Sequence, residues 1–138
     1  MRDATQNGTP ITAGHGASLI LAGAILGFLA IAFGAFGAHA IEHSLSAEAM
    51  GWWRTAGMYH LPLSAATVTM GALTRVGFPG ARGAGWCFVV GVIVFAGSLY
   101  ALALTGARWL GAVTPIGGLA MMAGFLCLAL GAWKARNA

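Results

Sequence analysis

The chain is poor in charge. Of its 138 residues, seven are Lys or Arg and three are Asp or Glu, so charged residues make up 7%, against about a quarter in ordinary soluble domains. A soluble domain of this size could not cover its surface with so few polar groups while 59% of its residues are apolar. The surrounding medium must itself be apolar, which predicts an integral membrane protein in contact with the lipid bilayer.

Clusters of basic residues are also missing. The net charge is +4, but the basic residues stand singly, which argues against a nucleic-acid partner. Cysteine is scarce, and Cys87 and Cys127 both fall inside apolar runs, so we interpret them as small buried residues rather than as a disulfide or a metal site. No carboxylate lies deep in an apolar run, which argues against a proton-coupled pump.

Four uncharged runs dominate the rest of the sequence, and we predict helices over residues 17–40, 55–74, 83–107 and 109–133. At about 1.5 Å per residue each helix is long enough for the roughly 30 Å hydrocarbon core. We expect the first run to be a retained helix and not a signal peptide, because it is longer than an h-region and the residues before it are barely basic. The second run is the least apolar, and Pro62 is expected inside it.

The predicted fold is therefore all-α: an integral membrane protein with four transmembrane helices in an antiparallel bundle. We expect residues 17–138 to form this single domain, after a polar cytoplasmic tail over residues 1–16. Residues 41–53 are predicted as a loop or short interfacial helix. Turns are predicted over residues 75–82 and around Gly106 and Arg108, where Gly and Pro punctuate the sequence.

The distribution of Lys and Arg predicts the orientation. On one side of the predicted membrane lie Arg2, Arg75, Arg82, Lys134 and Arg136, and on the other lie Arg54 and Arg108. Because basic residues are enriched in cytoplasmic segments, this bias places both termini in the cytoplasm. We expect the protein to lie in a bacterial inner membrane.

Glycine is abundant, with 22 of the 138 residues. In a membrane, small residues let helices approach closely, because lipid provides no hydrophobic drive between them. Two rows stand out by their spacing, and we predict that they pack tightly against helices of the same chain or of a partner: Gly23, Gly27 and Gly34 in the first helix, and Gly117, Gly124 and Gly131 in the fourth.

Two groups of residues invite a metal or cofactor hypothesis. His39, Glu42 and His43 spell H-x-x-E-H, a zinc motif that requires the three residues to share one helix face. His39 and His60 lie near the outer ends of the first two predicted helices, where two axial histidines could hold a b-type haem. The simpler interpretation is that these residues only hydrogen-bond at a membrane boundary, so no cofactor is predicted and haem b is kept as an alternative.

A third group is predicted to meet at the outer corner between helices three and four. Its members are Ser98, Tyr100, Thr105, Arg108, Thr114 and Pro115, with Arg54 and Tyr59 at the same interface. Proline frees a backbone carbonyl that hydroxyls can satisfy, so one interpretation is a hydrogen-bonded structural corner in which Tyr100 and Thr114 are coupled. The other interpretation is a small polar vestibule open to the outside.

Several of these segments resemble one family. The segments are Gly34 to His39 (GAFGAH), Thr55-Ala56 with Tyr59, Gly97 to Leu104 (GSLYALAL) and Thr114 to Gly118 (TPIGG). In this order they resemble the domain of unknown function 423 family, which includes the animal transmembrane protein 256. The resemblance implies a small multi-helix membrane protein with no established activity.

No catalytic group of residues rises above background, so we expect a non-enzymatic membrane protein. The small-residue rows favour helix docking, which predicts an accessory or assembly subunit of an inner-membrane complex, with other membrane subunits as partners. The alternative is a small transporter or channel-like protein that uses the outer vestibule. A haem b protein is the third hypothesis.

Overall fold

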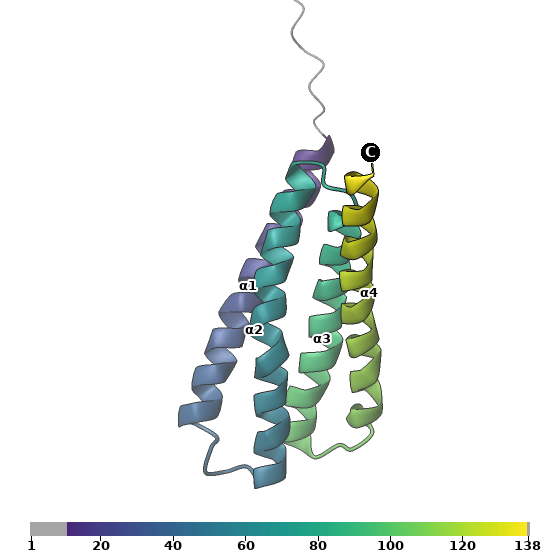
Figure 1. Cartoon of the computed structure of the whole chain (residues 1–138). Coiled ribbons are helices and arrows are strands. Elements are labelled where there is room, and N and C mark those ends of the chain that lie inside the picture. Colours follow the sequence, from purple (N-terminus) through teal and green to yellow (C-terminus); the bar gives the residue numbers. More distant parts are fainter. Residues whose placement is uncertain (1–10, 138) are drawn as a thin grey trace, which may run out of the picture.

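The protein is all-helical. The computed structural model describes residues 11–137, which form α1 (Ile11–His39), α2 (Ala47–Arg75), α3 (Ala81–Thr105) and α4 (Leu110–Arg136) (Figure 1). Short loops join the helices at alternate ends, and the C-terminus lies at the same end as the α2–α3 loop (Figure 1). The predicted fold class is confirmed as far as helices are concerned. Within the described residues α1, α3 and α4 are each long and apolar enough to cross a membrane.

The first helix begins earlier than the sequence suggested. α1 starts at Ile11, so the prediction that a tail extends to residue 16 was wrong for its last residues. The remainder of the predicted tail, residues 1–10, lies outside the described part of the chain. The segment before residue 17 is uncharged after Asp3, and the hydroxyl of Ser18 bonds back to the carbonyl of Gly14 at 3.1 Å, as it does within a continuous helix.

The start of α2 is a second correction. The helix begins at Ala47 and not at residue 55, so the predicted loop over residues 41–53 is a loop only in its first part. Ser46 is the N-cap: its backbone is extended, and its hydroxyl accepts a hydrogen bond from the N–H of Ala49 at 3.1 Å. Glu48 in the first turn favours the helix further, because the N-terminus carries partial positive charge.

A glycine flanks α3 at each of the two predicted turns, Gly80 before the helix and Gly106 after it. Gly106 follows the last residue of α3 with φ +69°, and its N–H bonds to the carbonyl of Leu102 at 2.9 Å. Gly80 precedes the helix with φ +80°, and a Cβ there would lie 2.5 Å from the carbonyl oxygen of Cys127 on α4. Both positions require a left-handed backbone, which glycine adopts without steric cost.

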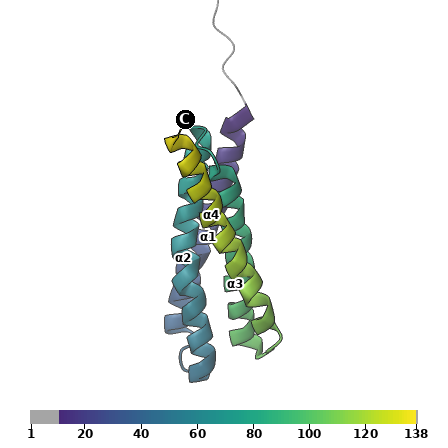
Figure 2. The same ribbon diagram turned by 45° about the vertical axis from the view of Figure 1, so that its right-hand side comes forward.

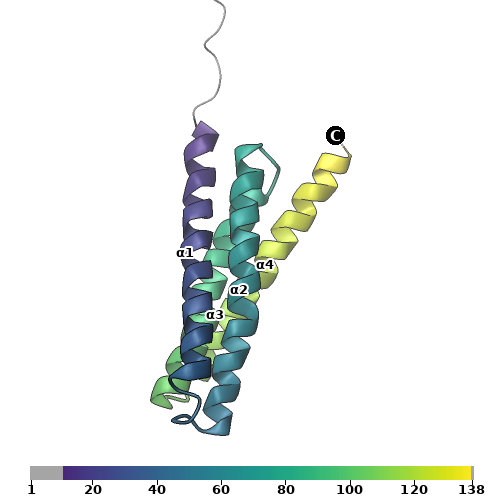
Figure 3. The same cartoon turned by 90° about the vertical axis from the view of Figure 1, so that its left-hand side faces the viewer.

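The four helices form a row of neighbours. α1 lies against α2, α2 against α3 and α3 against α4, with a smaller contact between α1 and α3. Within the described residues the backbone of α4 does not approach that of α1 or α2. Figure 3 shows α4 leaning away from α2 toward the C-terminus, and in the view of Figure 2 α4 crosses in front of the other helices. α2 and α3 are therefore the central helices, while α1 and α4 are peripheral.

Part of the low hydropathy of α2 comes from the face that it turns toward other helices. The buried polar side chains His60, Ser64, Thr67 and Thr74 all lie on α2. Ser64, Thr67 and Thr74 donate their hydroxyl protons to carbonyls one turn earlier in the helix, at 2.6, 2.8 and 2.7 Å. These residues are satisfied inside the protein and away from lipid. Pro62 lies inside α2, as predicted, on an exposed position.

The glycine row of α4 faces α3. A Cβ at Gly124 would lie 2.6 Å from Cε1 of Phe88, and a Cβ at Gly117 would collide with the backbone of Phe95. Gly131 approaches the carbonyl of Pro79 in the α2–α3 loop just as closely. Gly117 and Gly124 allow α3 and α4 to approach closely, the role that small residues play between membrane helices, and Gly131 does the same toward the α2–α3 loop.

The close-contact row of α1 has a different phase from the predicted one. Gly16, Gly23 and Gly37 are tightly packed: at Gly23, for example, a Cβ would lie 2.7 Å from the backbone nitrogen of Val68. A Cβ at Gly27 would make ordinary contact with Ser64, at 3.7 Å, and one at Gly34 would meet nothing within 4 Å. Tight packing within the chain is therefore found at Gly23 of the predicted row and not at Gly34, whose packing against a partner helix stays a prediction. A spacing of seven residues fixes the pitch of a contact row but not which face carries it.

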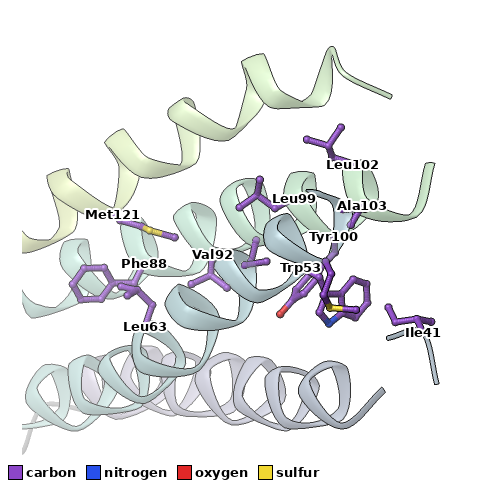
Figure 4. Close-up of a cluster of buried hydrophobic side chains, with 14 of the residues drawn as sticks. Ile41, Trp53, Leu63, Phe88, Val92, Leu99, Tyr100, Leu102, Ala103 and Met121 are labelled. Atoms are coloured by element: carbon purple, nitrogen blue, oxygen red, sulfur yellow. The ribbon is translucent and has the colours of Figure 1, made fainter. Parts of the chain in front are cut away.

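Large buried side chains gather between the central helices (Figure 4). Phe88 is fully buried near Leu63 and Met121, while Trp53 and Tyr100 lie together toward the opposite end, beside Ile41 (Figure 4). The rings of Trp53 and Tyr100 are 4.5 Å apart between centroids. This aromatic end of the core carries the candidate site.

Candidate functional site

The predicted outer corner is divided into two separate polar contacts. The first joins α3 to α4: the hydroxyls of Ser98 and Thr114 are 2.7 Å apart, and both residues are buried. Ser98 also lies 2.9 Å from the carbonyl of Phe95, and Thr114 lies 3.2 Å from the carbonyl of Leu110. Two hydroxyl protons cannot serve three contacts, and the two shorter distances favour Thr114 donating to Ser98 and Ser98 donating to Phe95.

The second contact joins α2 to α3. The hydroxyl of Tyr100 lies 3.3 Å from Nδ1 of His60, and both side chains are buried. The prediction that Tyr100 is coupled to Thr114 was therefore wrong. Tyr100 points toward α2, because a helix residue two positions from Ser98 is rotated by about 200° around the axis.

His60 also reaches toward the first helix. Its ring lies beside that of Phe33 on α1, with centroids 6.3 Å apart, and its Nε2 atom is buried without a hydrogen-bond partner among the described residues. If Tyr100 donates to Nδ1, the ring carries its proton on Nε2. His60 therefore lies between α1 and α3.

The other predicted corner residues are at the protein surface. Thr105 bonds to the carbonyl of Ala101 at 2.6 Å and accepts from the N–H of Ala107, which closes the end of α3. The carbonyl that Pro115 leaves without a donor is that of Gly111, whereas Thr114 bonds to Leu110, so the expected pairing was wrong. Tyr59 is 43% exposed and packs edge-on against Phe95, with centroids 4.9 Å apart.

Two ion pairs lie at the same end of the molecule as the α1–α2 and α3–α4 loops. Arg54 lies 3.5 Å from Glu42, and Arg108 lies 3.9 Å from Glu48. All four side chains are largely exposed, so each pair contributes at most about 1 kcal/mol. Their consequence is electrostatic: the arginines at this end are matched by carboxylates.

The candidate metal and haem residues do not converge. α1 ends at His39, so Glu42 and His43 are in the following loop and do not share a helix face with His39 as the zinc motif requires. His39 is exposed at the end of α1, while His60 is buried and bonded to Tyr100. Within the described residues no three His, Cys, Asp or Glu side chains come together in a group suited to a metal ion.

A groove that the sequence did not predict lies between the C-terminal end of α1 and the N-terminal part of α2. It has a volume of about 570 Å³. Small and aliphatic residues form its walls, among them Gly34, Ala38 and Leu61, while Trp53 and Tyr100 line its inner side. Glu42 and Arg54 stand among its lining residues as an ion pair. No sequence pattern indicates this groove, because only the tertiary structure brings Trp53 against Gly37.

A second groove lies on the side where α4 leans away. Its volume is about 330 Å³, and its lining residues come from α2, α3 and α4: Tyr59, Leu63, Phe95, Gly118, Met121, Met122 and Phe125. Aromatic and methionine side chains dominate this lining. Both grooves therefore open on the flanks of α2, but on different faces of that helix.

Comparison with known proteins places the chain in a family. The model of the family described as "Protein of unknown function (DUF423)" matches residues 33–118, from the second half of α1 into α4. A UPF0382 membrane protein of Staphylococcus haemolyticus is 40% identical over 115 residues, which cover 83% of this chain and 94% of that protein. The UPF0382 inner membrane protein of Escherichia coli is 35% identical over 126 residues, covering 86% of this chain and 92% of that protein.

A UPF0382 membrane protein of Bacillus subtilis is 36% identical over 117 residues, which cover 83% of this chain and 95% of that protein. No solved structure matches the chain. The predicted resemblance is thus confirmed both by the family model and by relatives that match over nearly their whole length. The chain belongs to the DUF423 family, the family of the UPF0382 membrane proteins.

Proposed function

We propose that the protein is a non-enzymatic accessory or assembly subunit that docks a transmembrane helix of another inner-membrane protein. The observation that carries this proposal is the groove between α2, α3 and α4. Within the described residues α4 packs on α3 and touches the α2–α3 loop at Gly131, but its backbone does not approach that of α2, so one side of α2 has no closely packed helix. That side presents Gly118, two methionines and three aromatic rings.

The chemistry of this groove suits a helix. Lipid provides no hydrophobic drive between membrane helices, so association rests on close fitting of surfaces. A Cβ at Gly118 would meet only the ring of Phe95, at 3.9 Å, so the wall is shallow there and a second backbone can approach. Met121 and Met122 add flexible side chains that adapt to a partner surface.

The polar groups of the interior support a structural role. The hydroxyls of Ser98 and Thr114 bond to each other, and Ser98 also bonds to a backbone carbonyl. The hydroxyl of Tyr100 bonds to His60. Groups engaged in this way hold helices together and are not free for a substrate.

Photo-crosslinking tests the docking proposal. A photoreactive amino acid at Met122, which is 68% exposed in the groove, should give a single protein adduct in native membranes. The matched control is Ile93 on α3, which is 58% exposed and outside the groove, and should react with lipid only. Gly118→Phe should remove the Met122 adduct by filling the groove. Lipid adducts alone at Met122, or an adduct unchanged by Gly118→Phe, would refute helix docking at this site.

We further propose that all four helices span the bilayer as an antiparallel bundle with both termini in the cytoplasm. α2 has 29 residues, about 43 Å at 1.5 Å per residue, which exceeds the hydrocarbon core. Its buried polar residues are screened from lipid by its neighbours. Arg75, Arg82, Lys134 and Arg136 lie in or beside segments at the end with the C-terminus, whereas the arginines at the other end pair with Glu42 and Glu48.

Thiol labelling in intact cells tests this orientation. In a background with Cys87 and Cys127 replaced, Ser44→Cys in the α1–α2 loop should react with a membrane-impermeant maleimide. Val76→Cys in the α2–α3 loop, where the residue is 78% exposed, should react only after the cells are permeabilised. The opposite pattern would place the termini outside.

A further inference from the structure

We propose that the groove between α1 and α2 binds one acyl chain of a phospholipid whose headgroup carries both a phosphate and a primary ammonium, as in phosphatidylethanolamine. In this arrangement the phosphate lies at Arg54 and the ammonium at Glu42. The site is independent of the helix-docking groove, because residues 57 and 59 of α2, which line the two grooves, are about 200° apart around the helix.

The groove exists because α1 and α2 are held close at one end and apart at the other. At the end with the C-terminus, a Cβ at Gly71 would lie 2.8 Å from the carbonyl oxygen of Gly16, so the two backbones touch. Toward the other end the ring of Trp53 is inserted between the helices, directly against Gly37. Its Nε1–H donates to the carbonyl of Phe33 at 3.1 Å, which fixes the ring in place.

The depth of the groove matches one leaflet of the bilayer. On α1 the lining runs from Ala30 to Ala38, about 12 Å at 1.5 Å per residue. On α2 it extends from Met50 to Leu61, about 16 Å. Half of the hydrocarbon core is about 15 Å, so the groove ends near the bilayer midplane. A partner helix needs a seam across both leaflets, whereas an acyl chain needs one.

The lining suits an alkyl chain. Gly34, Ala35 and Ala38 on α1 leave a shallow wall, since a Cβ at Gly34 would meet nothing within 4 Å. Ile31 and Leu61 provide aliphatic contact near the inner end. The volume of about 570 Å³ falls within the roughly 300–1,000 Å³ that is typical of small-ligand sites.

The charges at the mouth select the headgroup. Nη2 of Arg54 and Oε1 of Glu42 are 3.5 Å apart, and their side chains are 69% and 46% exposed, so both can reach a ligand. A guanidinium binds phosphate through charge-assisted hydrogen bonds, and a carboxylate accepts them from an ammonium. A headgroup with phosphate alone would leave Glu42 facing negative charge. The pair therefore favours a zwitterionic lipid with N–H donors over an anionic one.

Native mass spectrometry of the full-length protein tests the proposal. Delipidated protein is exposed to vesicles of equal phosphatidylethanolamine and phosphatidylglycerol, and bound lipids are identified after transfer to detergent. We expect one tightly held phosphatidylethanolamine per chain. Arg54→Gln should weaken the retention of this lipid about tenfold, since it removes a hydrogen-bonding charge. Glu42→Gln should abolish the preference for phosphatidylethanolamine while lipid is still bound.

A bulky substitution distinguishes lipid bound in the groove from lipid that merely contacts the protein surface. Gly34→Phe fills the groove and should release the lipid, whereas Gly97→Phe adds the same ring at an exposed α3 position outside it, where a Cβ also meets nothing within 4 Å. If Gly34→Phe fails to fold, Ala38→Leu at the mouth serves the same purpose. Equal retention of both lipids by the wild type, or a Gly34→Phe protein that folds and still retains its lipid, would overturn the proposal.

Discussion

A single methyl group at Gly124 should destabilise the contact between α3 and α4. In Gly124→Ala the new Cβ would lie 2.6 and 2.7 Å from two ring carbons of Phe88, and 3.1 Å from the carbonyl oxygen of Ala84. Ordinary carbon contacts lie near 3.5–4.0 Å, so the ring or the helix must move by about 1 Å. Phe88 is fully buried, and on α4 its ring meets Phe125, with centroids 4.7 Å apart, so there is little free space for the movement.

The size of the effect follows from two opposing contributions. Overpacking a close-packed site costs about 1–3 kcal/mol. Alanine is a better helix former than glycine by about 1 kcal/mol in water, which offsets part of that cost. Gly97→Ala on α3 gains the helix preference of alanine without the cost of overpacking, because its Cβ meets nothing within 4 Å. The difference between the two variants therefore isolates the steric cost, and we expect Gly124→Ala to be less stable than Gly97→Ala by about 1–3 kcal/mol.

Reversible unfolding in mixed micelles measures this difference. Far-ultraviolet circular dichroism during an SDS titration gives the free energy of unfolding of each variant. Phe88→Leu in the Gly124→Ala background should recover part of the loss, because neighbouring substitutions are not additive. If both alanine variants unfold at the same SDS fraction, the glycine row of α4 does not face α3 and the close helix contact described here is refuted.

Two further predictions concern the polar contacts between helices. Ser98→Ala and Thr114→Val should each cost modest stability and show a coupling free energy of about 0.6 kcal/mol, the average for membrane hydrogen bonds, in a double-mutant cycle; a coupling of zero would mean that the hydroxyls do not meet. Tyr100→Phe should be additive with Thr114→Val, since their hydroxyls have different partners. It should be non-additive with His60→Leu, and the same SDS titration would refute the His60–Tyr100 contact if it found the reverse.

The sequence predicted the number and order of the helices because each long uncharged run has one energetically acceptable form in lipid. The predicted start of α2 is too late because a single charge such as Arg54 does not by itself end a helix. In the structure Arg54 extends from the helix surface to Glu42, so a charge is tolerated one helical turn or more inside the helix. The capping signal at Ser46 was present in the sequence and marked the true start.

The candidate site was less predictable, because it depends on how each helix is rotated about its axis. Gly27 and Gly34 have the same seven-residue spacing as Gly16 and Gly23, and periodicity does not distinguish the two rows. The partner of Tyr100 depends on the same rotation. The α1–α2 groove depends on where Trp53 is inserted between helices, which no local pattern records.

The polar inner face of α2 has a consequence for biosynthesis. Within the described residues α2 is long enough to cross a membrane but is the one helix that is not apolar enough, and its buried hydroxyls and imidazole lie against α1 and α3. A segment of this kind enters lipid poorly when it leaves the insertion machinery alone. Because the loop is short, the strongly apolar α3 is synthesised soon after α2, so α2 and α3 should be integrated as one hairpin. Truncating the nascent chain before α3 should then leave α2 outside the bilayer.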